Sequence, residues 1–313
     1  MMRTPGPNLN PDEPSPAQDV SADGPRVFAL SDVHADMKTN MAWMQNLSAT
    51  AYQHDTLILA GDVSDNLATL HIVLSDLSTR FAHVCFVPGN HELWVRRQEC
   101  PDSVAKFDEI MRLCDGLGVH TQPLQVGTSP VSQSVWIVPL FSWYVKPEEG
   151  PDSLFAAKAG EDPTLAMWSD NYFTKWPWDE TDTPSAYFLR LNEARVTQPY
   201  EGPVISFSHF LPRAELIYST PQELQALGVT SARDPHPTFN FSRVAGSTEI
   251  EAQIRRLGSI THVYGHQHRN RNRLIDGVRY VSHCLGYPRE QQRWLQHGVR
   301  PADGPALIWP QPS

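Results

Sequence analysis

The sequence predicts an α/β fold built around parallel strands, and two features carry this prediction. Short continuous apolar runs recur along the chain, and amphipathic stretches with helical periodicity separate them. A short apolar run suits a strand that is buried on both faces, as strands of parallel sheets are. Strands that alternate with helices form βαβ units with right-handed crossovers. Ligands of such sheets collect outside the carboxyl ends of the strands.

The predicted elements cover most of the chain from residue 27 onward. Strands are expected at 27–30, 56–60, 84–87, 134–140, 204–207 and 260–264. Helices are expected at 38–49, 66–77, 103–117, 184–196 and 248–257. Thr248, with Glu251 three residues on, is the expected N-cap of the last helix. Asp276-Gly277 lies between two apolar stretches and predicts a hairpin.

Three segments lack a regular pattern. Residues 1–24 are rich in Pro, Asn, Asp and Ser and are expected to form a disordered tail, with 25–313 as one domain. Residues 142–200 carry several Trp and Tyr, and we expect an insertion that caps the functional site. The alternative for this insertion is a small separate core under a long loop. The tail after about residue 301 gives no prediction.

Composition excludes several classes of protein. The formal net charge of -10 argues against nucleic acid as the partner, because phosphate neutralisation needs basic patches. The four cysteines are scattered, which favours a reducing compartment over a disulfide framework. No run approaches the ~20 apolar residues of a membrane helix, and no secretory signal is visible. A cytoplasmic protein is therefore expected.

Polar residues of metal-binding types follow five of the predicted strands. Asp32 and His34 come after the first strand, and on an extended backbone their side chains would leave on the same side. The other four sets are Gly61-Asp62-Val63-Ser64-Asp65, Gly89-Asn90-His91-Glu92, Ser208-His209 and Gly265-His266-Gln267-His268.

The residue types in these motifs indicate the kind of metal site. His, Asp and Asn without Cys favour first-row ions such as Mn, Fe or Zn over a thiolate-bound structural zinc. Copper is an alternative, because affinity rises along the Irving–Williams order. The ligands outnumber the needs of one ion, so two ions about 4 Å apart with a shared carboxylate are expected. Gly61, Gly89 and Gly265 would let the backbone approach these ions closely.

As an ordered set, the five motifs resemble those of the calcineurin-like metallophosphoesterase superfamily, over about residues 27–285. The resemblance implies a four-layer α/β/β/α sandwich. It implies that the residues of one metal site are Asp32, His34 and His268, those of the other are Asn90, His209 and His266, and the bridge is Asp62. A bridging hydroxide would attack phosphorus, His91 would protonate the leaving oxygen, and Asp65 would orient the His91 ring.

One motif departs from the protein Ser/Thr phosphatases of this superfamily. They have an arginine directly after the Asp at position 65, where this chain has Asn66, so a bidentate clamp on the phosphoryl group is missing there. Arg96, Arg97 or Arg269 could take its place. Arg96 and two aromatic residues of the insertion, Trp143 and Tyr144, are the predicted substrate-binding residues.

The expected activity is hydrolysis of a phosphate ester or pyrophosphate of a small organic molecule. The alternative is a phosphodiesterase that acts on a nucleotide or a lipid-type headgroup. A protein phosphatase, a metal-bearing scaffold and an amide hydrolase are weaker alternatives. The scaffold reading conflicts with the full ligand set, because such proteins usually lose ligands. The sequence gives no indication of the oligomeric state.

Overall fold

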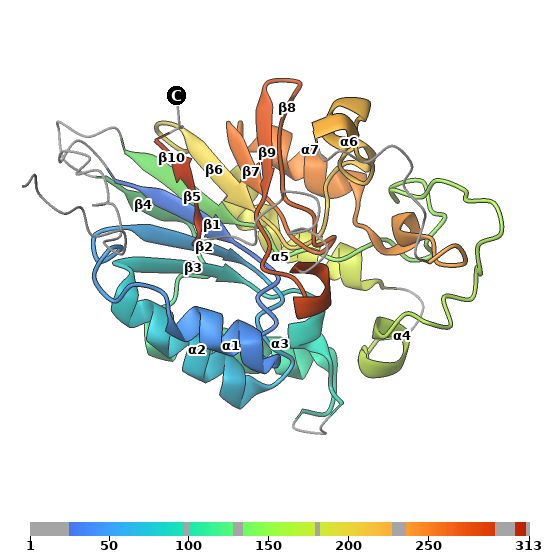
Figure 1. The fold of residues 1–313 in the computed structure, drawn as a ribbon. Helices are drawn as coiled ribbons and strands as arrows, with labels where there is room; N and C mark the ends of the chain where they lie inside the picture. Colours follow the sequence, from blue (N-terminus) through green and yellow to red (C-terminus); the bar gives the residue numbers. More distant parts are fainter. Residues whose placement is uncertain are drawn as a thin grey trace, which may run out of the picture.

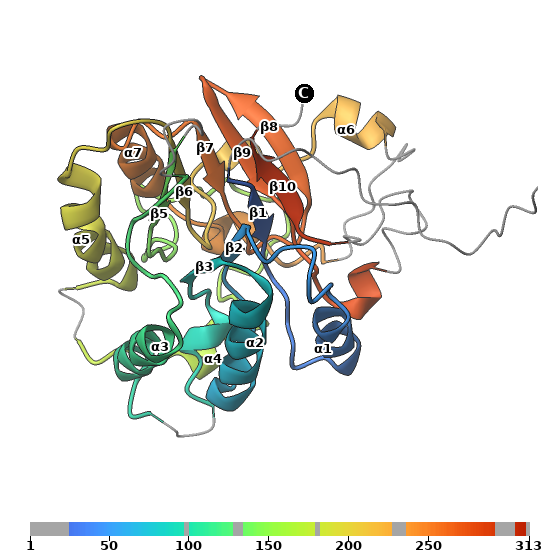
Figure 2. The same ribbon diagram turned by 90° about the vertical axis from the view of Figure 1, so that its left-hand side faces the viewer.

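Two β-sheets lie against each other at the centre of the structure, and helices cover their outer faces (Figure 1). The computed structural model describes residues 25–96, 100–127, 134–178, 182–226, 236–291 and 304–310. The predicted disordered tail, residues 1–24, lies outside these ranges. Figure 2 shows α1, α2 and α3 on one side of the sheets and α5 and α7 on the other. This arrangement confirms the expected α/β/β/α layers.

The first sheet has the strand order β10-β1-β2-β3. Its strands are β10 (Ala306–Trp309), β1 (Val27–Leu30), β2 (Thr56–Ala60) and β3 (His83–Val87). The three consecutive strands are parallel, and α1 (Lys38–Gln45) and α2 (Leu67–Arg80) connect them. Every residue of β1 and β2 is buried, as the unbroken apolar runs predict. Helix α3 (Ser103–Leu117) follows β3 and packs beside α2.

The second sheet has the order β4-β5-β6-β7-β9-β8. Its strands are β4 (Leu124–Val126), β5 (Val135–Pro139), β6 (Val204–Phe207), β7 (Thr261–Val263), β8 (Arg271–Ile275) and β9 (Val278–Ser282). The inner strands β5, β6, β7 and β9 are parallel, and both edge strands are antiparallel. The predicted hairpin is β8–β9, with its turn at Asp276-Gly277.

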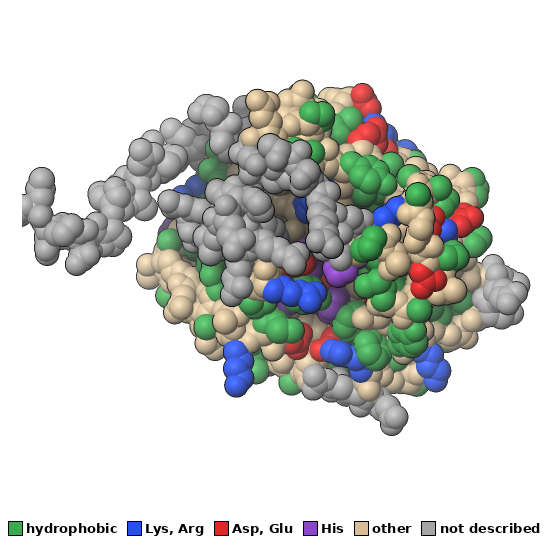
Figure 3. Space-filling view, turned by 45° about the vertical axis from the view of Figure 1, so that its right-hand side comes forward, with side chains coloured by type: hydrophobic (Ala, Val, Ile, Leu, Met, Phe, Trp, Pro, Cys, Tyr) green, Lys and Arg blue, Asp and Glu red, His purple; other side chains and the backbone are tan. Residues whose placement is uncertain are grey.

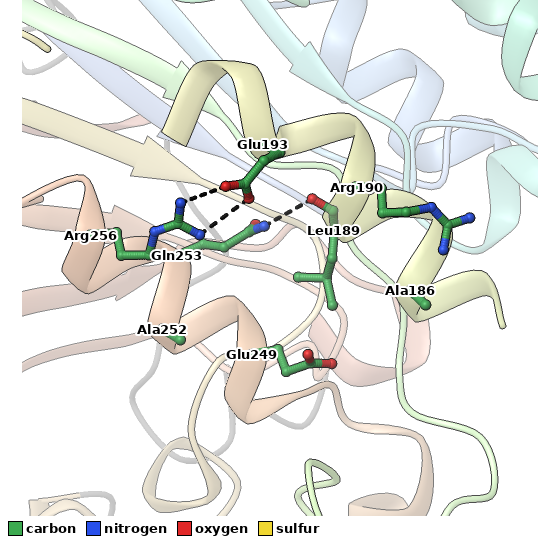
Figure 4. A pocket seen from close by; sticks show the side chains of 8 residues that line it. All are labelled: Ala186, Leu189, Arg190, Glu193, Glu249, Ala252, Gln253 and Arg256. Carbon is green, nitrogen blue, oxygen red and sulfur yellow. Dashed lines mark hydrogen bonds and ion pairs between the residues drawn. The ribbon is translucent and has the colours of Figure 1, made fainter. Parts of the chain in front are cut away.

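Helices α5 (Pro184–Thr197) and α7 (Thr248–Arg256) lie side by side over the second sheet. Asn192 links them inside the protein, because its amide donates to Gln253 and to the carbonyl of Phe141. Side chains of both helices also line a surface groove, where Arg256 forms a bidentate ion pair with Glu193 (Figure 4). None of the predicted metal ligands lines this groove. The α5 part of the predicted insertion thus belongs to a helix layer.

Several elements differ from the sequence prediction. Strands β4 and β10 and helices α4 (Asp170–Phe173) and α6 (Pro221–Ala226) were not expected, and α1 ends earlier than residue 49. The predicted N-cap of α7 was wrong by one position. Ser247 accepts the N–H of Glu249, and Thr248 is already helical. In the described ranges, no helix combines the length and hydropathy of a membrane span.

Candidate metal centre

The loops after β1, β2 and β7 carry their metal-binding side chains in an uncommon backbone conformation. Asp32, His34 and Asp62 have φ values of 50°, 46° and 56°, and His266 and His268 have 73° and 53°. These five are among seven non-glycine residues with positive φ in the described part of the chain. The expectation of an extended backbone at Asp32 and His34 was therefore wrong. Their side chains converge because both residues adopt the left-handed conformation, which Asp and His tolerate better than most residues.

The buried side chain of Glu92 holds two of these loops together. Its carboxylate accepts the backbone N–H groups of Asp62, Val63 and Ser64 at 2.7–2.9 Å. It also accepts the N–H of Gly89, at 2.7 Å. Glu92 therefore fixes the loop that carries Asp62 against the loop that carries Asn90 and His91.

A first group of four possible ligands is Asp32, His34, Asp62 and His268. One donor atom of each lies within 4.8 Å of the others. The Nε2 atoms of His34 and His268 are 2.9 Å apart, and Nε2 of His268 is 3.4 Å from Asp32 Oδ1. Asp32 Oδ1 also accepts the N–H of His266, which ties the β1 loop to the β7 loop. Histidine side chains are visible at the centre of one hollowed face of the molecule (Figure 3).

A second group consists of Asp62, His209 and His266, again within 4.8 Å of one another. His209 Nε2 is 3.5 Å from Asp62 Oδ2 and 3.2 Å from His266 Nδ1. The side-chain oxygen of Asn90 is also 3.2 Å from His209 Nε2. Asp62 belongs to both groups, so its carboxylate lies between them.

Three of the histidines use one ring nitrogen in a hydrogen bond away from the centre, so that the other ring nitrogen faces the centre. His209 donates from Nδ1 to the carbonyl of Ala60 at 2.9 Å, and His266 donates from Nε2 to the carbonyl of Val244 at 3.0 Å. His268 donates from Nδ1 to Glu290 at 2.8 Å. Partners of this kind set the tautomer of metal-binding histidines. The donor set and its orientation therefore fit two first-row metal ions.

Asn90 is oriented in the same way by a residue that the sequence analysis did not identify. Its amide nitrogen donates to the buried carboxylate of Asp170 at 2.8 Å, which turns the amide oxygen toward His209. The indole of Trp94 donates to the same carboxylate oxygen at 2.7 Å. Burial raises the pKa of Asp170 to about 6. Asp170 starts α4, so this part of the predicted insertion reaches the centre.

Close backbone approach explains two glycines of the motifs. Gly61 has a φ of 81°, and a Cβ there would lie 2.6 Å from Nδ1 of His209. A Cβ at Gly89 would collide with the carboxylate of Asp62. Both positions need glycine so that the loops can pack against the ligands.

The surroundings of His268 favour the protonated, positively charged form of its ring. Burial alone would lower the pKa of His268, but contacts with Asp32 and Glu290 outweigh burial and raise it to about 10. The pKa values of the buried His34, His209 and His266 are lowered, chiefly by desolvation. Without a metal ion, the group of Asp32, His34, Asp62 and His268 therefore holds a proton on His268, in the position where a cation would bind.

His91 lies beside the two ligand groups. The backbone N–H of His91 donates to Asp62 Oδ1 at 3.0 Å, and its ring Nε2 is 3.8 Å from Asp62 Oδ2. Its ring lies against the indole of Trp94, with 3.7 Å between centroids. Burial, followed by neighbouring histidines, lowers the pKa of His91. The hydroxyl of Tyr287 is 3.3 Å from its Nε2.

Asp65 and Arg96 form an ion pair next to this stack. Both Nε and Nη2 of Arg96 donate to Asp65 Oδ2, and the guanidinium lies over the Trp94 ring, 5.0 Å from its centroid. The buried ammonium of Lys106 donates to the carbonyls of Asp65 and Trp94. Arg97 lies outside the described residues. The pairing of Asp65 with His91 itself stays a prediction.

The two aromatic residues predicted to bind substrate are buried, each with an exposed fraction of 1%. Trp143 packs at 5.0 Å from both Trp176 and Phe210, and Tyr144 packs on Phe210 at 5.6 Å. This burial favours the small-core alternative for these two residues. Among the described aromatic residues of the predicted insertion, Trp168 reaches a candidate ligand, because its ring lies 5.8 Å from that of His266.

Four further residues support the centre, and the sequence analysis identified none of them: Asp170, Lys106, Tyr287 and Glu290. Asp170 and Lys106 stand among helix residues without a metal-type spacing, so no sequence signal marked them. The stretch Gly286-Tyr287-Pro288-Arg289-Glu290 offered a weak signal, since it follows a predicted strand in the same way as the five motifs.

A family model for calcineurin-like phosphoesterases matches residues 25–270. The chain belongs to this family. It is therefore a metal-dependent hydrolase of phosphoric esters, as the five motifs predicted.

One relative is similar to this chain in both sequence and structure. The chain is 28% identical over 290 residues to the [acyl-carrier-protein] phosphodiesterase PptH of Mycobacterium tuberculosis, covering 87% of this chain and 82% of the relative. It is also similar to the crystal structure of phosphopantetheinyl hydrolase (PptH) from the same organism. The TM-score is 0.69 and the identity 25%, with 92% of this chain and 97% of that one covered.

We predict that Glu92→Gln lowers the free energy of unfolding by about 2–4 kcal/mol, measured by urea denaturation with a chelator present. An amide cannot accept from all four N–H groups, and its own NH₂ would face one of them. Glu201→Gln is the matched control, because Glu201 is exposed and should change stability by less than ~0.5 kcal/mol. Equal stability of the two variants would refute the role given to Glu92.

We predict that binding of Zn²⁺ to the metal-free protein at pH 7.5 releases at least one proton per chain. The raised pKa of His268 means that its ring is protonated below about pH 10, and metal binding requires the neutral ring. Affinity should therefore rise with pH, by up to about tenfold per unit. Titration calorimetry in buffers of different ionisation enthalpy measures the release, and an enthalpy independent of the buffer would contradict this expectation.

Proposed function

We propose that this protein is a dinuclear-metal phosphodiesterase that releases a phosphopantetheinyl group from an acyl carrier protein. The similarity to PptH over 87% of the chain supports the substrate, since that relative is described both as an [acyl-carrier-protein] phosphodiesterase and as a phosphopantetheinyl hydrolase. The bond that breaks joins phosphorus to an oxygen of the carrier protein, and water supplies the oxygen that replaces it. A small-molecule phosphomonoesterase is the competing function.

The charges of the side chains around the centre favour a diester substrate over a monoester substrate. A monoester dianion calls for a cationic clamp, whereas a diester has a single negative charge. Asn66 does not serve as a clamp, because its side chain accepts the N–H of Thr69 and caps α2. Arg96 is already neutralised by Asp65. Both observations favour the monoanionic substrate.

In this proposal, seven residues hold the two ions. Asp32, His34 and His268 would hold one ion, Asn90, His209 and His266 would hold the other, and Asp62 would be shared. When bound, two such ions lower the pKa of a bound water and stabilise charge on the phosphoryl oxygens. Glu290 and the carbonyls of Ala60 and Val244 keep the imidazole rings turned toward them.

His91 is the proposed general acid. Its Nε2 faces the centre on the side of Asp62 and Tyr287. Because burial lowers the pKa of the free ring, His91 has to gain its proton beside the anionic substrate, whose charge favours the imidazolium, and then passes that proton to the leaving oxygen. Asp65 contributes by position: it holds Arg96 over Trp94, and Trp94 holds the His91 ring. Arg96 keeps an exposed side chain in this arrangement, and its contact with the substrate stays a prediction.

The aromatic part of the insertion is proposed to bind the organic arm of the substrate through Trp168. This half-buried ring stacks on Phe239 at 5.4 Å and stands edge-on to His266 at 5.8 Å. Its indole nitrogen donates to the hydroxyl of Tyr144, which fixes the ring. A pantetheinyl chain is partly apolar, so an aromatic face beside a ligand can bind it.

The test is incubation of the Mn²⁺- or Zn²⁺-loaded protein with a carrier protein that bears the phosphopantetheinyl group. We expect mass spectrometry to show loss of that group, and Asp62→Asn to abolish the loss together with binding of close to two ions. Bis-para-nitrophenyl phosphate should be a better substrate than para-nitrophenyl phosphate. A strong preference for the monoester, with the carrier protein intact, would reject the proposal in favour of the phosphomonoesterase.

We predict that Trp168→Ala raises KM for the phosphopantetheinyl carrier protein by about 5-fold, since an aromatic contact contributes on the order of 1 kcal/mol. KM for bis-para-nitrophenyl phosphate should change little, because this probe lacks the arm. Trp136→Ala is the control, since Trp136 lies on β5 and packs on Tyr200. A parallel loss for both substrates would assign Trp168 to packing.

A further inference from the structure

The segment after β9 crosses back to the first sheet and is fixed there. Leu285 donates its N–H to the carbonyl of Ser31 at 3.1 Å, and Gly286 donates to the carbonyl of Asp32 at 2.9 Å. The amide of Asn40 donates to the carbonyl of Gly286 at 2.9 Å. These bonds place residue 287 directly beside the loop that carries Asp32 and His34.

Tyr287 uses this placement to contact the centre with both parts of its side chain. Its ring stacks on His34, with 4.3 Å between centroids and 21° between planes. Its hydroxyl points to His91, 3.3 Å from Nε2. Glu290 accepts the N–H of Tyr287 at 2.8 Å with the same oxygen that binds His268. The ring also lies 5.0 Å from the ring of His268, so it contacts two of the candidate metal-binding histidines.

The hydroxyl has hydrogen-bonding capacity beyond this contact. A phenol offers one donor and two acceptor sites, and among the described residues its one hydrogen-bond partner is His91. The contact with His91 uses one of these three sites, so the hydroxyl can turn its proton toward a bound molecule. The centre thus offers a neutral donor beside the proposed general acid.

We propose that the Tyr287 hydroxyl donates a hydrogen bond to a phosphoryl oxygen of the substrate. This inference rests on the proposed phosphodiesterase function and adds a catalytic residue to it. A neutral donor suits a phosphodiester monoanion, because it stabilises charge that grows on the oxygen without requiring a dianion. The ring has a separate task, which is to hold His34 in place.

Two substitutions separate the hydroxyl from the ring. Tyr287→Phe keeps the stacked ring, so we expect full metal content by elemental analysis. We also expect kcat/KM for bis-para-nitrophenyl phosphate to fall about 10–100-fold, within the range seen when one transition-state donor is removed. Tyr287→Leu removes the ring as well, and should in addition weaken metal binding. Tyr52→Phe is the matched control, since Tyr52 is also a stacked tyrosine but precedes β2, at the opposite end of the strands.

Binding of inorganic phosphate to the metal-loaded protein gives a readout without turnover. Tyr287→Phe should weaken phosphate binding by a similar factor, whereas Tyr52→Phe should not. Unchanged kinetics and phosphate binding in Tyr287→Phe, or loss of metal from this variant, would overturn the role of the hydroxyl. The carrier-protein assay stands apart from these measurements. If only that assay fails, the proposed substrate is wrong and the role of Tyr287 is still decided by the two probes.

Discussion

One buried carboxylate holds the centre of this protein together. Glu92 accepts four backbone N–H groups from the loops that follow β2 and β3. Without it, these buried donors would be unsatisfied, at a cost of about 1–3 kcal/mol each. One of the four belongs to Asp62, which is shared by both ligand groups. The geometry of the whole centre therefore depends on a carboxyl group that belongs to neither ligand group.

The loops that Glu92 and its neighbours hold are strained. Residues in the left-handed conformation cost on the order of 1–3 kcal/mol each, and five of the candidate ligands adopt it. Backbone bonds between loops maintain it: Asp32 donates to the carbonyl of Gly61, and His34 donates to that of Asp62, both at 2.9 Å. The left-handed conformation turns side chains of separate loops toward the two ligand groups.

The sequence was sufficient for features that local pattern controls. Apolar runs predicted β2 and β6 to the residue, and the ligand motifs were found because they follow such runs. Strand β10 was missed, because its four residues resemble any short apolar stretch and only pairing with β1 makes them a strand. Asp170 and Glu290 were missed for a similar reason: their partners, Asn90 and His268, lie 80 and 22 residues away in the chain.

Each sheet supplies part of the centre, which has a consequence for folding and solubility. Asp32, His34, Asp62 and Asn90 follow strands of the first sheet, whereas His209, His266 and His268 follow strands of the second. A cation held by His34 and His268 would link positions 234 residues apart and so close a very long loop. Such a cross-link disfavours the unfolded chain, increasingly so as the loop lengthens. Metal starvation would therefore loosen the contact between two apolar sheet faces, and newly made protein would be prone to aggregate.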